Sequence, residues 1–138
     1  MTILMPMVKV YIVEDDPLMS RMYEKIFTFE NYEVELADNG KDALDNVVKI
    51  NPDIILLDVM MPKMNGLQVL ELLKSDSTTN KIPVIMLTNL TGQEDAQKAI
   101  SKGAINYIVK SEHEPKEIVN MVKEVIDGQK KSKIPINI

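Results

Sequence analysis

The stretch Ile54-Ile55-Leu56-Leu57-Asp58-Val59-Met60-Met61-Pro62 places four large apolar residues directly before a carboxylate. A short, unbroken apolar run of this kind is typical of a strand that is buried on both faces of a parallel sheet. Asp58 follows this run at the point where the chain leaves the predicted sheet. In open α/β folds, ligands bind at this carboxyl edge. We therefore expect Asp58 to be a reactive carboxylate.

Strands and helices are predicted to alternate along the whole chain. Apolar and β-branched runs predict strands over residues 8–13, 33–37, 54–57, 84–87 and 106–109. Helical periodicity and capping signals predict helices over residues 17–29, 41–50 and 67–75, from the cap at Thr91 to about residue 102, and over 115–127. The alternation predicts right-handed βαβ crossovers and a doubly wound α/β fold, with a five-stranded parallel sheet between two helical layers. The mixed polar and apolar residues 33–37 indicate an edge strand.

Local signals predict where several helices begin and end. Asp16 and Asn39 are expected N-caps, and Thr91 with Glu94 matches a capping box. Gly128 is expected to end the last helix. Apolar residues at helical spacing are expected to form the core-facing stripes, namely Leu18, Met22, Ile26 and Phe29 in the first helix, Ala43, Leu44, Val47 and Val48 in the second, and Ala96, Ala99 and Ile100 in the fourth.

The length and composition indicate one ordinary globular domain. The 138 residues are 45% hydrophobic and 27% charged, and no cysteine is present for disulfide or thiol chemistry. We expect a domain over residues 8–128, a short N-terminal extension over 1–7, and a C-terminal tail or linker over 129–138 without a regular element. The net charge of −5 argues against a nucleic-acid partner, and no apolar run is long enough to suggest a membrane span.

Polar residues of different kinds follow four of the predicted strands: Glu14 and Asp15, Asp58, Thr88, and Lys110. Taken singly, each of these residues could also be a helix cap or a solvated surface residue. Parallel strands, however, bring all of them to the same edge of the sheet. Three neighbouring acids need a cation, and oxygen ligands without His or Cys suit Mg²⁺. Mg²⁺ and Lys110 together would neutralise an incoming phosphoryl group, to which Thr88 would donate a hydrogen bond. The pattern therefore favours phosphoryl transfer to a carboxylate nucleophile.

The chain resembles the receiver domain of bacterial two-component response regulators, in particular the stand-alone chemotaxis type. The resemblance rests on an ordered set of motifs: Val13-Glu14-Asp15, the segment from Leu57 to Pro62 with Gly66, Thr88, and Tyr107-Ile108-Val109-Lys110. It implies a flavodoxin-like fold with the strand order 2-1-3-4-5. Two positions depart from the family pattern: Ser111 stands where a proline with a cis bond is usual, and Asn89 where alanine is common.

The resemblance implies roles for the acids and the lysine. Asp58 would accept a phosphoryl group from a histidine kinase or a histidine phosphotransfer protein in a Mg²⁺-dependent reaction. Asp15, Asp58 and the backbone carbonyl of Met60 would bind the ion, and Glu14 would act mainly through water. Lys110 would pair with the phosphoryl oxygens. Pro62 and Gly66 would shape the loop over the metal.

The resemblance further implies a switch. Thr88 and Tyr107 would move on phosphorylation and change the surface of the fourth helix, fifth strand and fifth helix, where a downstream protein would bind. The domain would act in the cytoplasm, by docking or by relaying phosphate, either as a stand-alone receiver or as part of a longer regulator. It would not be a turnover enzyme, because phosphorylation and dephosphorylation occur only at its own Asp58.

Other functions fit parts of the pattern. A haloacid-dehalogenase-like phosphatase would need a second Asp two residues after the nucleophile, where this chain has Met60. A flavin-binding module would need a hydroxyl-rich phosphate loop after the first strand, but Glu14, Asp15 and Asp16 would repel that phosphate. The main alternative is a pseudo-receiver that binds partners without being phosphorylated.

Overall fold

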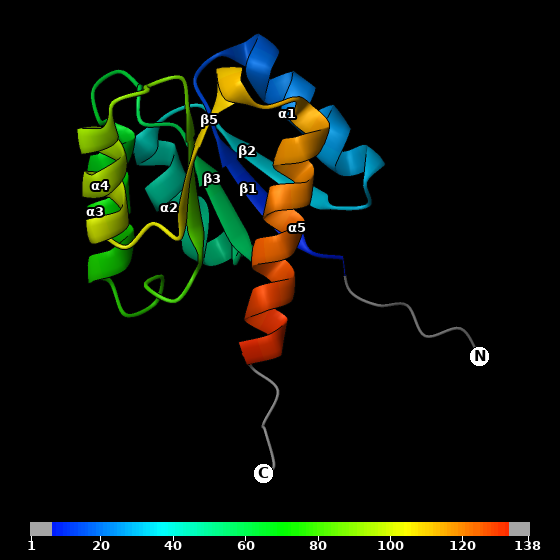
Figure 1. Ribbon diagram of the computed structural model, residues 1–138. Coiled ribbons are helices and arrows are strands. Elements are labelled where there is room, and N and C mark those ends of the chain that lie inside the picture. Colours follow the sequence, from blue (N-terminus) through cyan, green and yellow to red (C-terminus); the bar gives the residue numbers. More distant parts are fainter. Residues whose placement is uncertain (1–6, 133–138) are drawn as a thin grey trace.

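A parallel sheet forms the centre of the molecule (Figure 1). The computed structural model describes residues 7–132. The strands are β1 (Lys9–Val13), β2 (Glu33–Ala37), β3 (Ile54–Leu57), β4 (Val84–Thr88) and β5 (Asn106–Val109). Their order is β2-β1-β3-β4-β5, which confirms both the doubly wound fold and the edge position of β2.

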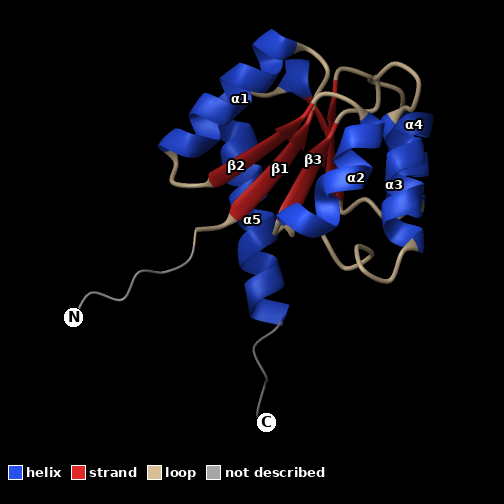
Figure 2. Ribbon diagram, turned by 180° about the vertical axis from the view of Figure 1, so that it is seen from behind, coloured by secondary structure: helices blue, strands red, loops and turns tan. Residues whose placement is uncertain are grey.

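Helices cover both faces of the sheet (Figures 1 and 2). One face carries α1 (Pro17–Phe29) and α5 (Pro115–Ser132), and the other carries α2 (Gly40–Ile50), α3 (Gly66–Ser75) and α4 (Gln93–Ser101). A short 3₁₀ helix, η1 (Lys110–Glu112), connects β5 to α5. In the described part of the chain, no helix has the length and apolar character needed to cross a bilayer.

The side chains of β3 contribute to both layers of the core. Ile55 and Leu57 pack in the cluster beneath α2, α3 and α4, whereas Ile54 and Leu56 pack in the cluster beneath α1 and α5. All four are buried, which confirms the prediction from the unbroken apolar run. Burying each such side chain contributes about 1.5–3 kcal/mol. The strand that leads into Asp58 is therefore firmly fixed.

The expected caps of the first two helices are confirmed, but the cap of α4 is not. The side chain of Asp16 accepts two backbone N–H groups of α1, and that of Asn39 accepts one of α2. The capping box at Thr91 is wrong. Helix α4 begins only at Gln93, its N-cap is Gly92, and no side chain caps it. Thr91 therefore lies before the first turn and cannot cap it.

The predicted core stripe of α1 is only partly right. Met22 and Ile26 are half-buried against the core, but Leu18 and Phe29 expose 77% and 84% of their surface. The buried positions are instead held by aromatic residues, Tyr23 and Phe27. These residues lie four positions apart on one helix face, and both are almost fully buried against the sheet.

Two other positions expected in the core are also exposed. Val48 and Ile100 face solvent, whereas their neighbours Val47 and Ala99, which were also expected in the core, are buried. A single apolar residue beside a core position does not define the buried face of a helix.

The last helix is longer than expected. Gly128 does not end α5, which continues to Ser132, so residues 129–132 are helical where the sequence indicated no element. Glycine ends a helix when it adopts a left-handed conformation, as Gly103 does after α4 with φ of 110°. Gly128 has no positive φ. Apart from Met7, the predicted N-terminal extension lies outside the described residues, as does the tail over 133–138.

Candidate functional site

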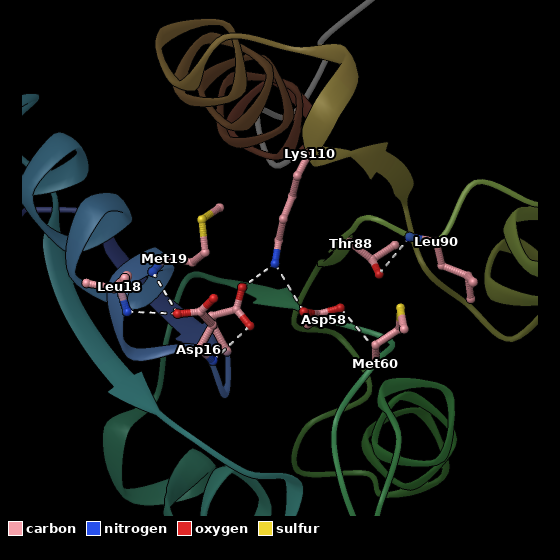
Figure 3. Close-up of polar contacts among 9 residues, drawn as sticks. Asp16, Leu18, Met19, Asp58, Met60, Thr88, Leu90 and Lys110 are labelled. Atoms are coloured by element: carbon pink, nitrogen blue, oxygen red, sulfur yellow. Dashed lines mark hydrogen bonds and ion pairs between the residues drawn. The ribbon is translucent and has the colours of Figure 1, made fainter.

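The carboxylate of Asp58 is held at the carboxyl edge of the sheet by contacts to both of its oxygens (Figure 3). Its backbone N–H donates to the carbonyl of Val13 at 3.1 Å, which keeps the residue in line with β1. Oδ1 accepts a hydrogen bond from the backbone N–H of Met60 at 3.0 Å, and Oδ2 accepts one from Nζ of Lys110 at 3.0 Å. The side chain is therefore fixed in orientation although it lies where the strand ends.

The loop after Asp58 can fold back only because residue 66 is glycine. A Cβ atom on Gly66 would lie 2.1 Å from the carbonyl oxygen of Asp58, which is inside van der Waals contact. The Gly66 N–H donates to the carbonyl of Val59 at 2.9 Å and closes the loop. This close approach supports the expectation that Gly66 shapes the loop beside the site.

Lys110 provides one buried cation for two buried acids. Its Nζ contacts Oε1 of Glu14 as well as Oδ2 of Asp58, and only 6% of its side chain is exposed. Burial opposes the charge on Lys110, but the hydrogen bond to Glu14 and the charges of both acids outweigh it and raise its pKa. Lys110 is thus a permanent positive charge in the site.

Glu14 keeps its proton more readily than an ordinary glutamate because it is buried. Burial raises the pKa of its carboxyl from 4.5 to about 7, and the nearby Asp58 adds to this effect. The hydrogen bond and charge of Lys110 act in the opposite direction without cancelling it. The raised pKa thus reflects mainly the burial of Glu14; the excess of negative charge follows from the count, since Glu14, Asp15 and Asp58 are three acids beside one lysine.

The acids predicted to hold a metal do come together. Glu14, Asp15 and Asp58 offer carboxylate oxygens that all lie within 4.8 Å of one another. Glu14 and Asp58 are buried, whereas Asp15 is exposed and borders a cleft of about 410 Å³ that opens to solvent. A donor set made only of hard oxygens, with excess negative charge and one open side, fits Mg²⁺.

Thr88 and Tyr107 form a second group, joined through the backbone of Leu90. The Leu90 N–H donates to Oγ1 of Thr88 at 3.3 Å, and the Tyr107 hydroxyl donates to the Leu90 carbonyl at 2.7 Å. Burial, followed by the charges of nearby acids, raises the pKa of Tyr107. In the described residues, no hydrogen bond joins this group to Asp58, although Figure 3 shows the Thr88 side chain beside it.

Two features of the site were not predicted. The Met60 N–H is a donor to Asp58, whereas the sequence suggested only its carbonyl as a metal ligand. An aspartate at the start of a loop often accepts the N–H two residues later, and this tendency was the available signal. The peptide bond between Lys110 and Ser111 is trans, since no cis bond occurs in the described residues.

Comparisons with known proteins agree with this geometry. Residues 10–123 match the family model of the response regulator receiver domain. Response regulator PleD of Caulobacter vibrioides is 41% identical over 102 residues, which cover 74% of this chain and 22% of that protein. The DNA-binding response regulator MtrA of Mycolicibacterium smegmatis is 34% identical over 115 residues, which cover 83% of this chain and 49% of that protein. The chain thus spans about half or less of the length of these relatives.

Solved receiver structures share the whole fold. Chemotaxis protein CheY4 of Vibrio cholerae aligns with a TM-score of 0.81 and 31% identity, covering 87% of this chain and 99% of that one. A CheY-like receiver domain protein from Methanospirillum hungatei aligns with a TM-score of 0.84 and 28% identity, covering 92% of this chain and 99% of that one. The chain therefore belongs to the response regulator receiver domains, which are phosphorylation signalling modules rather than turnover enzymes.

Proposed function

We propose that Asp58 receives a phosphoryl group from the phosphohistidine of a histidine kinase or a histidine phosphotransfer protein. A receiver domain implies a cognate histidine kinase. The observation that supports Asp58 as the acceptor is its position: it shares the buried Lys110 with Glu14, beside the acid cluster at the carboxyl edge. Like Glu14, it has one oxygen on Lys110 and the other on a backbone amide, but its amide contact, from the Met60 N–H at 3.0 Å, is shorter than that of Glu14, from the Asp16 N–H at 3.4 Å.

In the proposed reaction, an oxygen of Asp58 attacks the phosphorus atom and the phosphorus–nitrogen bond of the phosphohistidine breaks. The electron pair of that bond stays with the imidazole, which regains its ring nitrogen lone pair. Lys110 remains charged and stabilises the negative oxygens of the phosphoryl group. The hydroxyl of Thr88 turns from the Leu90 N–H and donates to one of these oxygens.

The acids would hold Mg²⁺ during this reaction. The proposed ligands are Asp15, Asp58 and the carbonyl of Met60, with Glu14 acting mainly through water. When bound, the ion supplies positive charge that neutralises the carboxylates and the phosphoryl oxygens. Asp15 is the exposed member of the cluster and gives the ion its way in from solvent.

The proposed output lies on the other side of Asp58. When Thr88 turns toward the phosphoryl group, it releases the Leu90 N–H, and Tyr107 follows because it bonds the carbonyl of the same residue. This local change would reshape the face formed by α4, β5 and α5, to which a downstream protein binds or from which phosphate is relayed. We assign this role to a cytoplasmic receiver unit over residues 8–128, together with the end of α5.

A phosphate-affinity gel tests this assignment. The protein is incubated with acetyl phosphate and Mg²⁺, beside Asp58→Asn and, as a control, Asp45→Asn in an exposed ion pair on α2. We expect a shifted band in the wild type and in Asp45→Asn, and none in Asp58→Asn. A shift that survives in Asp58→Asn would contradict the assignment. The absence of any shift in the wild type would favour a pseudo-receiver.

A further inference from the structure

One side chain beside Asp58 has no part in the proposed transfer. Met60 exposes 57% of its surface, and it belongs to neither apolar cluster of the described core. Its N–H donates to Oδ1 of Asp58 at 3.0 Å, so the backbone holds this residue against the acceptor carboxylate. Figure 3 shows the Met60 side chain beside Asp58, on the side away from Lys110. A solvent-exposed sulfur is therefore fixed next to the acceptor.

Among residues 7–132, one other methionine is as accessible as Met60. Met61 and Met86 expose only 8% and 0% of their surface. Four more are partly buried, namely Met19, Met22, Met64 and Met121. Met7 exposes 52%, but it precedes β1 and so lies toward the opposite edge of the sheet from Asp58. Met60 is thus the exposed thioether that lies at the site.

We propose that Met60 is a peroxide-sensitive site whose oxidation to the sulfoxide shortens the lifetime of the phosphoryl group on Asp58; this role presupposes that Asp58 is the acceptor. In the oxidation, a lone pair of Sδ attacks one oxygen of hydrogen peroxide and the O–O bond breaks. The other oxygen leaves as water with both hydrogens, so sulfur gives up an electron pair and the peroxide accepts it. Hydrogen peroxide is uncharged, and the acids around Asp58 therefore do not repel it.

Oxidation changes the surface that meets the water responsible for dephosphorylation. In that reaction a water oxygen bonds to phosphorus, the bond from phosphorus to the Asp58 oxygen breaks, and inorganic phosphate leaves with the protons of the water. The thioether of Met60 is only a weak hydrogen-bond acceptor, so it covers this approach without holding a water molecule. A sulfoxide is polar, and its oxygen accepts a hydrogen bond and orients the water. An oriented water reacts faster.

Oxidation and lifetime are measured on the same samples of the full chain. The wild type, Met60→Leu and Met7→Leu are treated with hydrogen peroxide, freed from it, labelled with acetyl phosphate and Mg²⁺, and separated from the phosphodonor. Mass spectrometry of the digested protein locates the sulfoxides, and a phosphate-affinity gel follows the loss of label. We expect sulfoxide at Met60 and Met7 before Met61 and Met86.

The lifetimes distinguish the two exposed methionines. Peroxide should shorten the lifetime about tenfold in the wild type and in Met7→Leu, which is the effect of about one hydrogen bond to the attacking water. In Met60→Leu the lifetime after peroxide should equal that before it. Methionine sulfoxide reductases should restore the lifetime of the oxidised wild type, because they return the thioether. Circular dichroism checks that each sample remains folded.

The possible failures are distinguishable. If Met60 stays unoxidised while Met7 reacts, if its oxidation leaves the lifetime unchanged, or if peroxide shortens the lifetime equally in Met60→Leu, the role of Met60 is wrong and Asp58 remains the acceptor. A wild type that takes no label before peroxide treatment would overturn the acceptor role of Asp58 and the role of Met60 with it.

Discussion

The two sides of the carboxyl edge around Asp58 are held together by different interactions. On one side, which we term the acid half, Glu14 and Asp58 share the buried Lys110, and all three side chains are less than 10% exposed. On the other, the switch half, Thr88 and Tyr107 are linked only by hydrogen bonds to the backbone of Leu90. Buried charge pairs are costly to separate, whereas a neutral hydrogen bond is exchanged at little cost.

This difference suits the two tasks of a receiver. The acceptor carboxylate must stay in one position for phosphoryl transfer, because displaced groups lose much of their effect on the rate. The switch half must change its arrangement when the charge at Asp58 changes, so its contacts must be weak enough to break. The comparison predicts large effects of substitutions in the acid half and small ones in the switch half.

The largest effect is expected for Lys110→Met. This change leaves Glu14 and Asp58 buried without their shared cation, so we expect a loss of about 3–5 kcal/mol in the free energy of unfolding. Loss of the charge that faces the phosphoryl oxygens should also slow phosphorylation by about 100-fold. Urea denaturation and the initial rate of labelling by acetyl phosphate measure the two effects.

Two variants control this prediction. Lys41→Met removes a cation from an exposed ion pair with Asp45 and should change stability by less than about 0.5 kcal/mol. Asp58→Asn removes one of the two acids that share Lys110 and should leave stability unchanged or raise it. Equal stability of Lys110→Met and the wild type would show that the acid half is not held by its ion pairs.

The second-largest expected effect is a dependence of the free energy of unfolding on pH. Because the pKa of Glu14 rises from 4.5 to about 7, the folded chain keeps a proton that the unfolded chain has lost between these values. The stability provided by protonated Glu14 is therefore complete below pH 4.5 and is lost as the pH rises through 7. The expected loss is about 1–3 kcal/mol, measured as the difference between the wild type and Glu14→Gln.

Magnesium provides a second check on Glu14. Because carboxylates bind the ion in their ionised form, Mg²⁺ binding should release a proton and become tighter as the pH rises toward 7. Calorimetry in two buffers of different ionisation enthalpy detects this proton. If the pH dependence of stability is the same in Glu14→Gln as in the wild type, another group is responsible.

A smaller effect is expected for Tyr107→Phe in the switch half. The change removes only the hydrogen bond to the Leu90 carbonyl and should cost about 1 kcal/mol. We expect faster amide hydrogen exchange in the segment from Asn89 to Gly92, with the initial rate of phosphorylation unchanged. Unchanged exchange in this segment would mean that Tyr107 does not hold the loop.

The smallest effect is expected for Lys102→Gln. Lys102 pairs with Glu71 and so connects the end of α4 to α3, but the pair is open to solvent, with 32% of the Lys102 side chain and 53% of the Glu71 side chain exposed. The loss in stability should be below about 0.5 kcal/mol and should shrink as salt is added. A loss as large as that of Lys110→Met would contradict the view that burial makes the ion pairs of the acid half costly to break.

The residues also show what sequence patterns can and cannot predict. The strand before Asp58 was predictable because a run of four apolar residues is typical of a doubly buried strand. The meeting of Glu14, Asp15 and Lys110 followed from parallel strands ending at one edge. The sharing of Lys110 between two acids could not be predicted. Lys110 and Glu14 are separated by 96 positions, and their pairing depends on side-chain packing.

Helix faces were less predictable than the sheet. Helix α1 carries two competing apolar stripes, and the one with Tyr23 and Phe27 faces the sheet, which leaves Phe29 exposed. Spacing alone does not say which stripe buries more area. Gly128 was misleading for a related reason, since glycine permits a left-handed end to a helix but does not require one.

The most direct test of Asp58 as the acceptor is chemical mapping of the phosphorylated residue. Sodium borohydride reduces an acyl phosphate to an alcohol, which converts a phosphorylated aspartate to homoserine at that position. After treatment with acetyl phosphate and Mg²⁺, mass spectrometry of the digested protein should find homoserine at position 58 and at no other acid. If homoserine were found at Asp15 or at another aspartate while Asp58 stayed unmodified, the account would be contradicted.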